Sequence, residues 1–143
     1  MEDSDASWAQ RRRAAAAEHA ASQERRKTAE SEQARTIVAA FVREATSLGI
    51  TAQPLTATPY SGGGRYRTNL VGWYIRQNHS LAIGTDGEYY ILNVPGSLRA
   101  RLTSATVPPV DPPLLTGAGG GDGETVPLDQ LLRKRLEAGN SFP

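Results

Sequence analysis

Apolar side chains are distributed unevenly along the chain, and its beginning contains almost none. In residues 1–34, rich in Ala, Glu, Arg, Gln and Ser, the only large apolar side chain after Met1 is Trp8. These residue types mostly favour helix, alanine most of all. A helix without a large apolar face gains little from packing. We therefore predict a charged helical extension over 1–34 that is solvated, partly disordered or docked on a partner. A coiled coil of this segment with itself is less favoured, because Leu, Ile and Val are absent from 6–36.

The pattern changes at Ile37, where large apolar residues begin to recur at helical spacing. They place one apolar face on a helix over 35–48, which we expect to pack on the rest of the protein. Gly49 follows and suits the left-handed residue after a helix end. The members of this face are Ile37, Val38, Phe41, Val42, Ala45 and Leu48.

The middle of the chain has the composition of β-strands. Residues 66–75, 80–85 and 88–94 are rich in aromatic and β-branched types, and Asp86-Gly87 predicts a hairpin between the last two segments. Residues 50–60 contain two prolines and are expected to form at best an edge strand. The fold class is therefore α+β, with a three- to four-stranded antiparallel meander packed on the helix over 35–48.

The turns set the register of this meander. A two-residue turn at Asp86-Gly87 places Ile83 opposite Tyr90. A three-residue loop over 77–79 places Trp73 and Ile75 on the face of Ile83, and this register buries more apolar area. A two-residue loop would place Tyr74 there instead. In the preferred register Tyr66 and Tyr74 face outward.

The end of the chain alternates between linker-like and helical composition. Residues 97–107 could add a short strand, and Pro and Gly dominate 103–125. Residues 127–138 predict an amphipathic helix with Thr125 as its N-cap and Gly139 at its end. The predicted organisation is an extension over 1–34, an α+β domain over 35–102, a linker over 103–125, and a C-terminal helix and tail over 126–143.

Composition narrows the functional classes. The 143 residues have a net charge of +1 and no cysteine, which excludes disulfides and thiolate chemistry. A charge this small does not by itself indicate nucleic acid or acidic lipid. No segment has the length of apolar sequence that a membrane span or signal peptide needs. We expect a soluble cytoplasmic protein without membrane association.

No group of residues in the sequence resembles a catalytic, cofactor or metal site. The glycine-rich run over 117–123 lacks the Lys-Ser/Thr of a phosphate loop. His19 and His79 are far apart, and Asp86 is explained by its turn. The sequence predicts neither a catalytic residue nor a cofactor nor a metal ion, and hence no enzyme.

The remaining features favour binding to another protein. The charged extension lacks a face to bury by itself, and the last helix carries a leucine stripe behind a linker, both of which suit helix-in-groove binding. The expected partner-binding residues are Trp8, Leu128, Leu131, Leu132 and Leu136.

The alternative function is nucleic-acid binding. Basic and aromatic residues alternate on one predicted strand, where arginines can follow phosphates and rings can stack on bases. These residues are Arg65, Tyr66, Arg67, Tyr74 and Arg76. Residues 11–27 add six basic side chains against two acidic ones, in clusters at 11–13 and 25–27.

Overall fold

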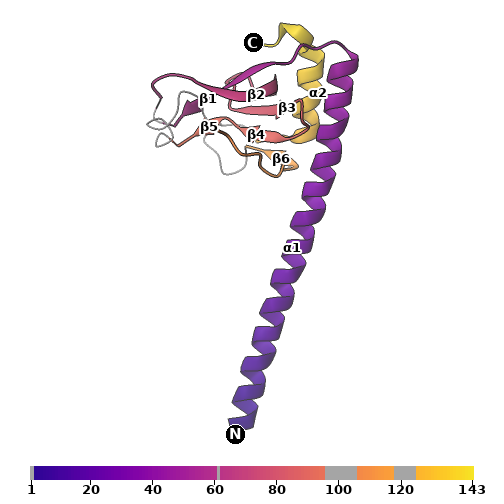
Figure 1. Cartoon of the computed structure of the whole chain (residues 1–143). Coiled ribbons are helices and arrows are strands. Elements are labelled where there is room, and N and C mark those ends of the chain that lie inside the picture. Colours follow the sequence, from indigo (N-terminus) through magenta and orange to yellow (C-terminus); the bar gives the residue numbers. More distant parts are fainter. Residues whose placement is uncertain (1, 61, 96–105, 118–124) are drawn as a thin grey trace.

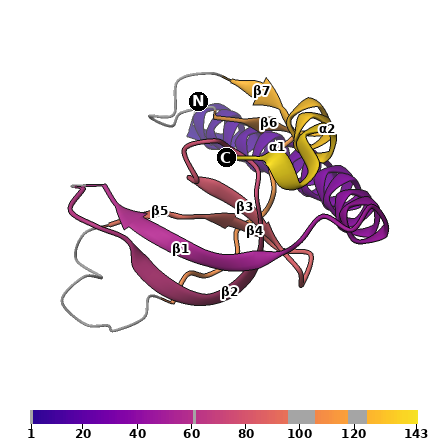
Figure 2. The same cartoon turned by 90° about the horizontal axis from the view of Figure 1, so that it is seen from above.

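The computed structural model describes residues 2–60, 62–95, 106–117 and 125–143, and shows two helices beside a curled sheet (Figures 1 and 2). The predicted α+β class is confirmed. In chain order the elements are α1 (Glu2–Ser47), β1 (Gln53–Pro59), β2 (Tyr66–Tyr74), β3 (Leu81–Gly84), β4 (Tyr89–Ile91), β5 (Asn93–Val94), β6 (Leu115–Thr116), β7 (Val126–Pro127), α2 (Leu128–Ala138) and the 3₁₀ turn η2 (Gly139–Ser141).

Helix α1 is continuous across the change in apolar pattern at Ile37. Its end has the two hydrogen bonds of a Schellman motif, from Ile50 N to Ala45 O at 2.9 Å and from Gly49 N to Thr46 O at 3.2 Å. Gly49 has a φ of 71°, which a glycine adopts without strain. The predicted helix end is therefore confirmed, and the chain turns here toward β1.

The main sheet has five strands in the order β4-β3-β2-β1-β5. Strands β1 to β4 form the predicted antiparallel meander, and β5 adds a parallel pairing with β1 that the sequence did not predict. The prediction that 50–60 lies at an edge is wrong, because β1 pairs on both sides. Pro54 is tolerated because it lies beside a register shift. Pro59 is tolerated because the residues on either side of it supply the hydrogen bonds: Thr58 N donates to Leu92 O, and Tyr60 N donates to Val94 O of β5.

The β3–β4 hairpin differs from the prediction by one residue. Ile83 lies opposite Tyr89 instead of Tyr90. Gly87 N donates to Gly84 O at 2.9 Å, and Gly87 has a φ of 81°, so the loop contains three residues and ends in a left-handed glycine. The Asp-Gly pair is therefore the end of a longer loop, and this moves Tyr90 to the other face of the sheet.

The preferred register of β2 against β3 is confirmed. Trp73 pairs with Ile83, and Ile75 N donates to Leu81 O at 2.9 Å. Gly72 and Gly84 also face each other in this pair. A Cβ atom on Gly72 would fall on the carbonyl oxygen of Ile83 and lie 2.7 Å from Gly84 Cα, so this close approach of the strands requires glycine.

Apolar side chains cover both faces of the sheet. One core lies between the sheet and the helices and contains Phe41 and Trp73, whose rings meet edge to face at 5.7 Å. The second lies on the other face, inside the curl of the sheet (Figure 2), where Leu55, Tyr74 and Tyr90 are buried. Neither face at the centre of the sheet therefore exposes aromatic rings on which bases could stack.

The C-terminal part packs back on this framework. Leu128 N donates to Leu114 O at 2.8 Å, and β6 pairs with β7 just before α2. The N-cap position is occupied by Pro127, without a side-chain capping bond, so the predicted Thr125 cap is wrong; the predicted end at Gly139 is confirmed. The possible strand over 97–107 falls almost entirely outside the described residues. Val107, which is described, is buried, and Val110 N bonds to Tyr89 O at 3.0 Å.

Candidate functional site

The first thirty or so residues of α1 project away from the sheet (Figure 1). We call residues 5–33 the projecting helix. Its side chains are exposed except for Ala9, Ser22 and Ser31, which are partly buried, and the first fully buried residue is Ala34. This part of the helix therefore presents its whole circumference to solvent.

Trp8 lies near the tip of the projecting helix. Its side chain is 57% exposed, and the guanidinium of Arg12 lies 3.9 Å from the centroid of its ring. This cation–π contact holds the indole against Arg12 of the next helical turn. The position is compatible with the predicted role of Trp8 in binding a partner, which stays a prediction.

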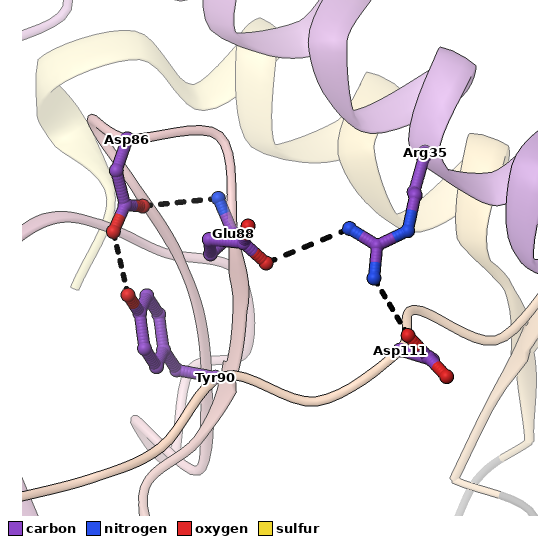
Figure 3. Close-up of polar contacts among 5 residues, drawn as sticks. All are labelled: Arg35, Asp86, Glu88, Tyr90 and Asp111. Atoms are coloured by element: carbon purple, nitrogen blue, oxygen red, sulfur yellow. Dashed lines mark hydrogen bonds and ion pairs between the residues drawn. The ribbon is translucent and has the colours of Figure 1, made fainter.

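Arg35 anchors the helix where it meets the body (Figure 3). Its Nη2 donates to Asp111 Oδ1 at 2.6 Å, and its Nη1 lies 3.6 Å from Glu88 Oε2. The hydrogen bond to Asp111 is the main cause that raises the pKa of Arg35. One side chain thus joins three segments, although partial exposure limits the stabilisation to about 0–1 kcal/mol. The sequence did not reveal this contact, since Asp111 is 76 residues away from Arg35.

The two carboxylates of the β3–β4 hairpin are engaged in structural contacts. Asp86 accepts hydrogen bonds from Glu88 N at 3.0 Å and from the Tyr90 hydroxyl at 2.6 Å (Figure 3). Burial, and then the contact with Asp86, raise the pKa of Tyr90 above its ordinary value. With Glu88 facing Arg35, this arrangement does not leave two carboxylates facing each other across a cleft, as paired-acid hydrolysis requires.

The leucine stripe of α2 faces the protein's own core. Leu128 and Leu132 are buried together with Phe41 of α1, and Leu131 and Leu136 are partly buried against the same cluster. In this arrangement the stripe holds α2 on α1. Leu128 and Leu132 are not accessible to another protein, contrary to the predicted partner-facing role of this stripe.

The strand residues expected to contact nucleic acid do not form a stacking surface. Tyr74 is only 4% exposed, accepts a hydrogen bond from Thr56 N at 2.9 Å, and stacks on His79 at a centroid distance of 3.9 Å. The prediction that Tyr74 faces outward is wrong, because the second core covers this face of the sheet. Tyr66 is partly buried, its hydroxyl fully so.

The arginines that were predicted to contact nucleic acid differ in their exposure. Arg65 and Arg67 are exposed, whereas Arg76 is partly buried and donates from Nη2 to Thr116 Oγ1 at 3.3 Å. The strand therefore offers exposed charge at its first end, where Tyr66, between Arg65 and Arg67, is partly buried.

The histidines also have structural positions. His79 lies in the loop after β2 with a φ of 62°, and His19 lies on the projecting helix. In the part of the chain that the structure describes, no three His, Asp or Glu side chains come together as a metal site. Neither described helix is long and apolar enough to cross a membrane.

The geometry defines an α+β protein with a projecting charged helix. No protein-family model, no curated protein and no solved structure matches the chain.

Proposed function

We propose that this protein is a non-enzymatic cytoplasmic adaptor that binds another protein through the projecting helix. The observation that carries the proposal is the contrast between the two halves of α1. Residues 34–47 are packed and anchored, whereas residues 5–33 have no packed face. Most helical stability in proteins comes from packing, so a helical partner would supply what the projecting helix lacks.

The charges of the projecting helix suggest how such a partner would be recognised. Side chains seven residues apart lie on nearly the same face, and one such column consists of Arg11, Glu18, Arg25 and Glu32, all exposed. Charges of alternating sign beside a helix seam select the partner and its orientation in helix pairs. We call these four residues the charge column.

The residues beside the charge column indicate that the partner contributes the large apolar side chains. Ala14, Ala17 and Ala21 lie next to it and allow another helix to approach closely. Alanine alone buries too little apolar area for a stable pair of identical helices. A helix with larger apolar residues and a complementary charge column is the partner that fits.

A charge-reversal pair tests this proposal in the full-length protein. We expect Arg11→Glu combined with Arg25→Glu to abolish co-purification of a stoichiometric partner from nuclease-treated lysate. The matched control is Arg13→Glu combined with Arg26→Glu, which makes the same change in net charge at exposed positions outside the column. It should retain the partner. Equal loss in both variants, or no loss in either, would contradict the proposal.

The same experiment addresses nucleic-acid binding, for which the basic clusters at 11–13 and 25–27 remain exposed. Nucleic acid would be recognised mainly through total charge, so both variants would weaken binding similarly and the affinity would fall steeply with salt. Nuclease would then remove the co-purifying material. That result would replace the adaptor by the nucleic-acid alternative.

A further inference from the structure

A cavity of about 610 Å³ lies between the loop that follows β2 and the helix α2 with its C-terminal turn. This volume is in the range of small-molecule sites. Its charged side chains are those of Arg76, Lys134 and Arg135, and none of the described residues that line it is Asp or Glu. Leu131, Val126 and Phe142 provide apolar surface. The cavity is thus cationic with an apolar side.

Arg135 is the unusual member of this lining. It is only 4% exposed, yet no carboxylate among the described residues forms an ion pair with it. Its Nε donates to Tyr74 O at 2.6 Å and its Nη1 to Gly139 O at 2.7 Å, while its guanidinium lies 4.3 Å from the centroid of the Phe142 ring. All three partners are neutral, so the charge itself is not compensated.

A buried cation without a counter-ion is costly, because desolvation disfavours the charged form. The same desolvation lowers the pKa of Arg135. Its two internal hydrogen bonds fix the orientation of the guanidinium. The third nitrogen, Nη2, makes no hydrogen bond to a described residue and stays available to a ligand. A guanidinium held in this way presents the N–H groups of Nη2 to an oxyanion, with which they form charge-assisted hydrogen bonds.

We propose that this cavity binds a small molecule that combines an oxyanion group, a phosphate or carboxylate, with an apolar body. Arg135 binds the oxyanion from the floor of the cavity, and Lys134 contributes a second charge from the exposed side. Leu131 and Phe142 contact the apolar part. The ligand provides the negative charge that Arg135 lacks. This site is separate from the projecting helix and does not depend on the adaptor proposal.

Binding of four small molecules to the full-length protein distinguishes recognition of the oxyanion from recognition of the apolar body. These probes are phenyl phosphate, benzoate, inorganic phosphate and neutral benzyl alcohol. We expect phenyl phosphate or benzoate to bind with a dissociation constant of about 1 mM or below. Amide NMR shifts should centre on Arg76, Lys134 and Ser141. Inorganic phosphate should bind more weakly because it lacks the apolar body, and benzyl alcohol should not bind. The tighter of the two aromatic anions identifies the oxyanion.

Substitution of Arg135 is unsuitable as the main test, since the residue also holds Tyr74 and Gly139 in place. Lys134→Gln removes an exposed charge from the cavity wall, and we expect it to weaken binding of the better aromatic anion about three- to tenfold. Arg133→Gln is the matched control, because Arg133 is exposed on the same helix and does not line the cavity. It should leave the affinity unchanged. Equal weakening by both variants, binding of benzyl alcohol as tight as that of phenyl phosphate, or shifts confined to the projecting helix would overturn the proposal.

Discussion

Gly72 lies where β2 and β3 approach too closely to leave room for a side chain. It faces Gly84 in β3, and the atoms that a new Cβ would meet belong to the backbone of β3. Backbone atoms cannot turn away as a flexible side chain does. We therefore expect Gly72→Ala to lower the free energy of unfolding by about 1–3 kcal/mol or more, measured by urea denaturation.

Val71→Ala is the control for this substitution. Val71 is the preceding residue of β2 and its side chain is 44% exposed. We expect its loss to cost less than about 1 kcal/mol. If Gly72→Ala were as stable as Val71→Ala, β2 and β3 would not approach each other this closely at Gly72.

Tyr90 links stability to alkaline pH. Its hydroxyl is buried and donates to Asp86 at 2.6 Å, and the folded protein raises its pKa. Below about pH 10 the phenol is protonated in both the folded and the unfolded chain, so the stabilisation is fully present. Above that pH the unfolded chain loses its proton first, and the stabilisation decreases. The stability advantage of the wild type over Tyr90→Phe should therefore shrink as pH rises above about 10.

The measurement is a series of urea denaturation curves for both proteins between pH 8 and 11. Tyr60→Phe is the control, because Tyr60 is 65% exposed. Its difference from the wild type should stay near zero throughout. A Tyr90→Phe difference that is independent of pH would show that the hydroxyl is not held in this buried contact.

At the scale of elements, the docking of α1 depends on a few large side chains. Phe41 is buried against Trp73 in the core between helix and sheet. We expect Phe41→Ala to lower the free energy of unfolding by about 3–5 kcal/mol, since it leaves a cavity under the helix. Leu48→Ala, at a side chain that is 66% exposed just after the end of the same helix, should cost far less. Comparable losses in thermal denaturation would contradict the assignment of Phe41 to the core.

The elements that the sequence predicted well are those set by local periodicity. The apolar face that begins at Ile37 led to the docked end of α1, and burial of Trp73 with Ile83 selected the register of β2. The predicted register of the β3–β4 hairpin was wrong because Asp-Gly is compatible with loops of two or three residues. The pairing of β5 with β1 was missed because it joins residues about 35 positions apart, which strand periodicity does not reveal.

The sequence analysis did not predict the cationic cavity, although one residue of α2 indicated it. Arg135 follows Leu128 by seven positions and Leu132 by three, which places a charge on the apolar face of α2. A charge in that position requires a special environment. Its surroundings come from β2 and the C-terminal turn, and only the fold brings these segments to α2.

At the scale of the whole molecule, the projecting helix makes the protein far longer than its residue number suggests. The 46 residues of α1 correspond to a length of about 69 Å. A compact chain of 143 residues would have a radius of gyration of about 14–15 Å. Small-angle scattering of the monomer should therefore give a clearly larger radius and a maximum dimension of at least about 69 Å.

Deletion of residues 2–30 should change the overall dimensions of the protein without changing its thermal stability. It should reduce the radius of gyration to nearly the compact value, because it removes most of the projecting helix. It should leave the thermal midpoint almost unchanged, because burial along α1 begins at Ala34. A full-length radius near the compact value would mean that the helix is folded back or unfolded. A large loss of thermal stability on deletion would mean that residues 2–30 pack on the body, and the projecting helix would then have no free surface to offer a partner.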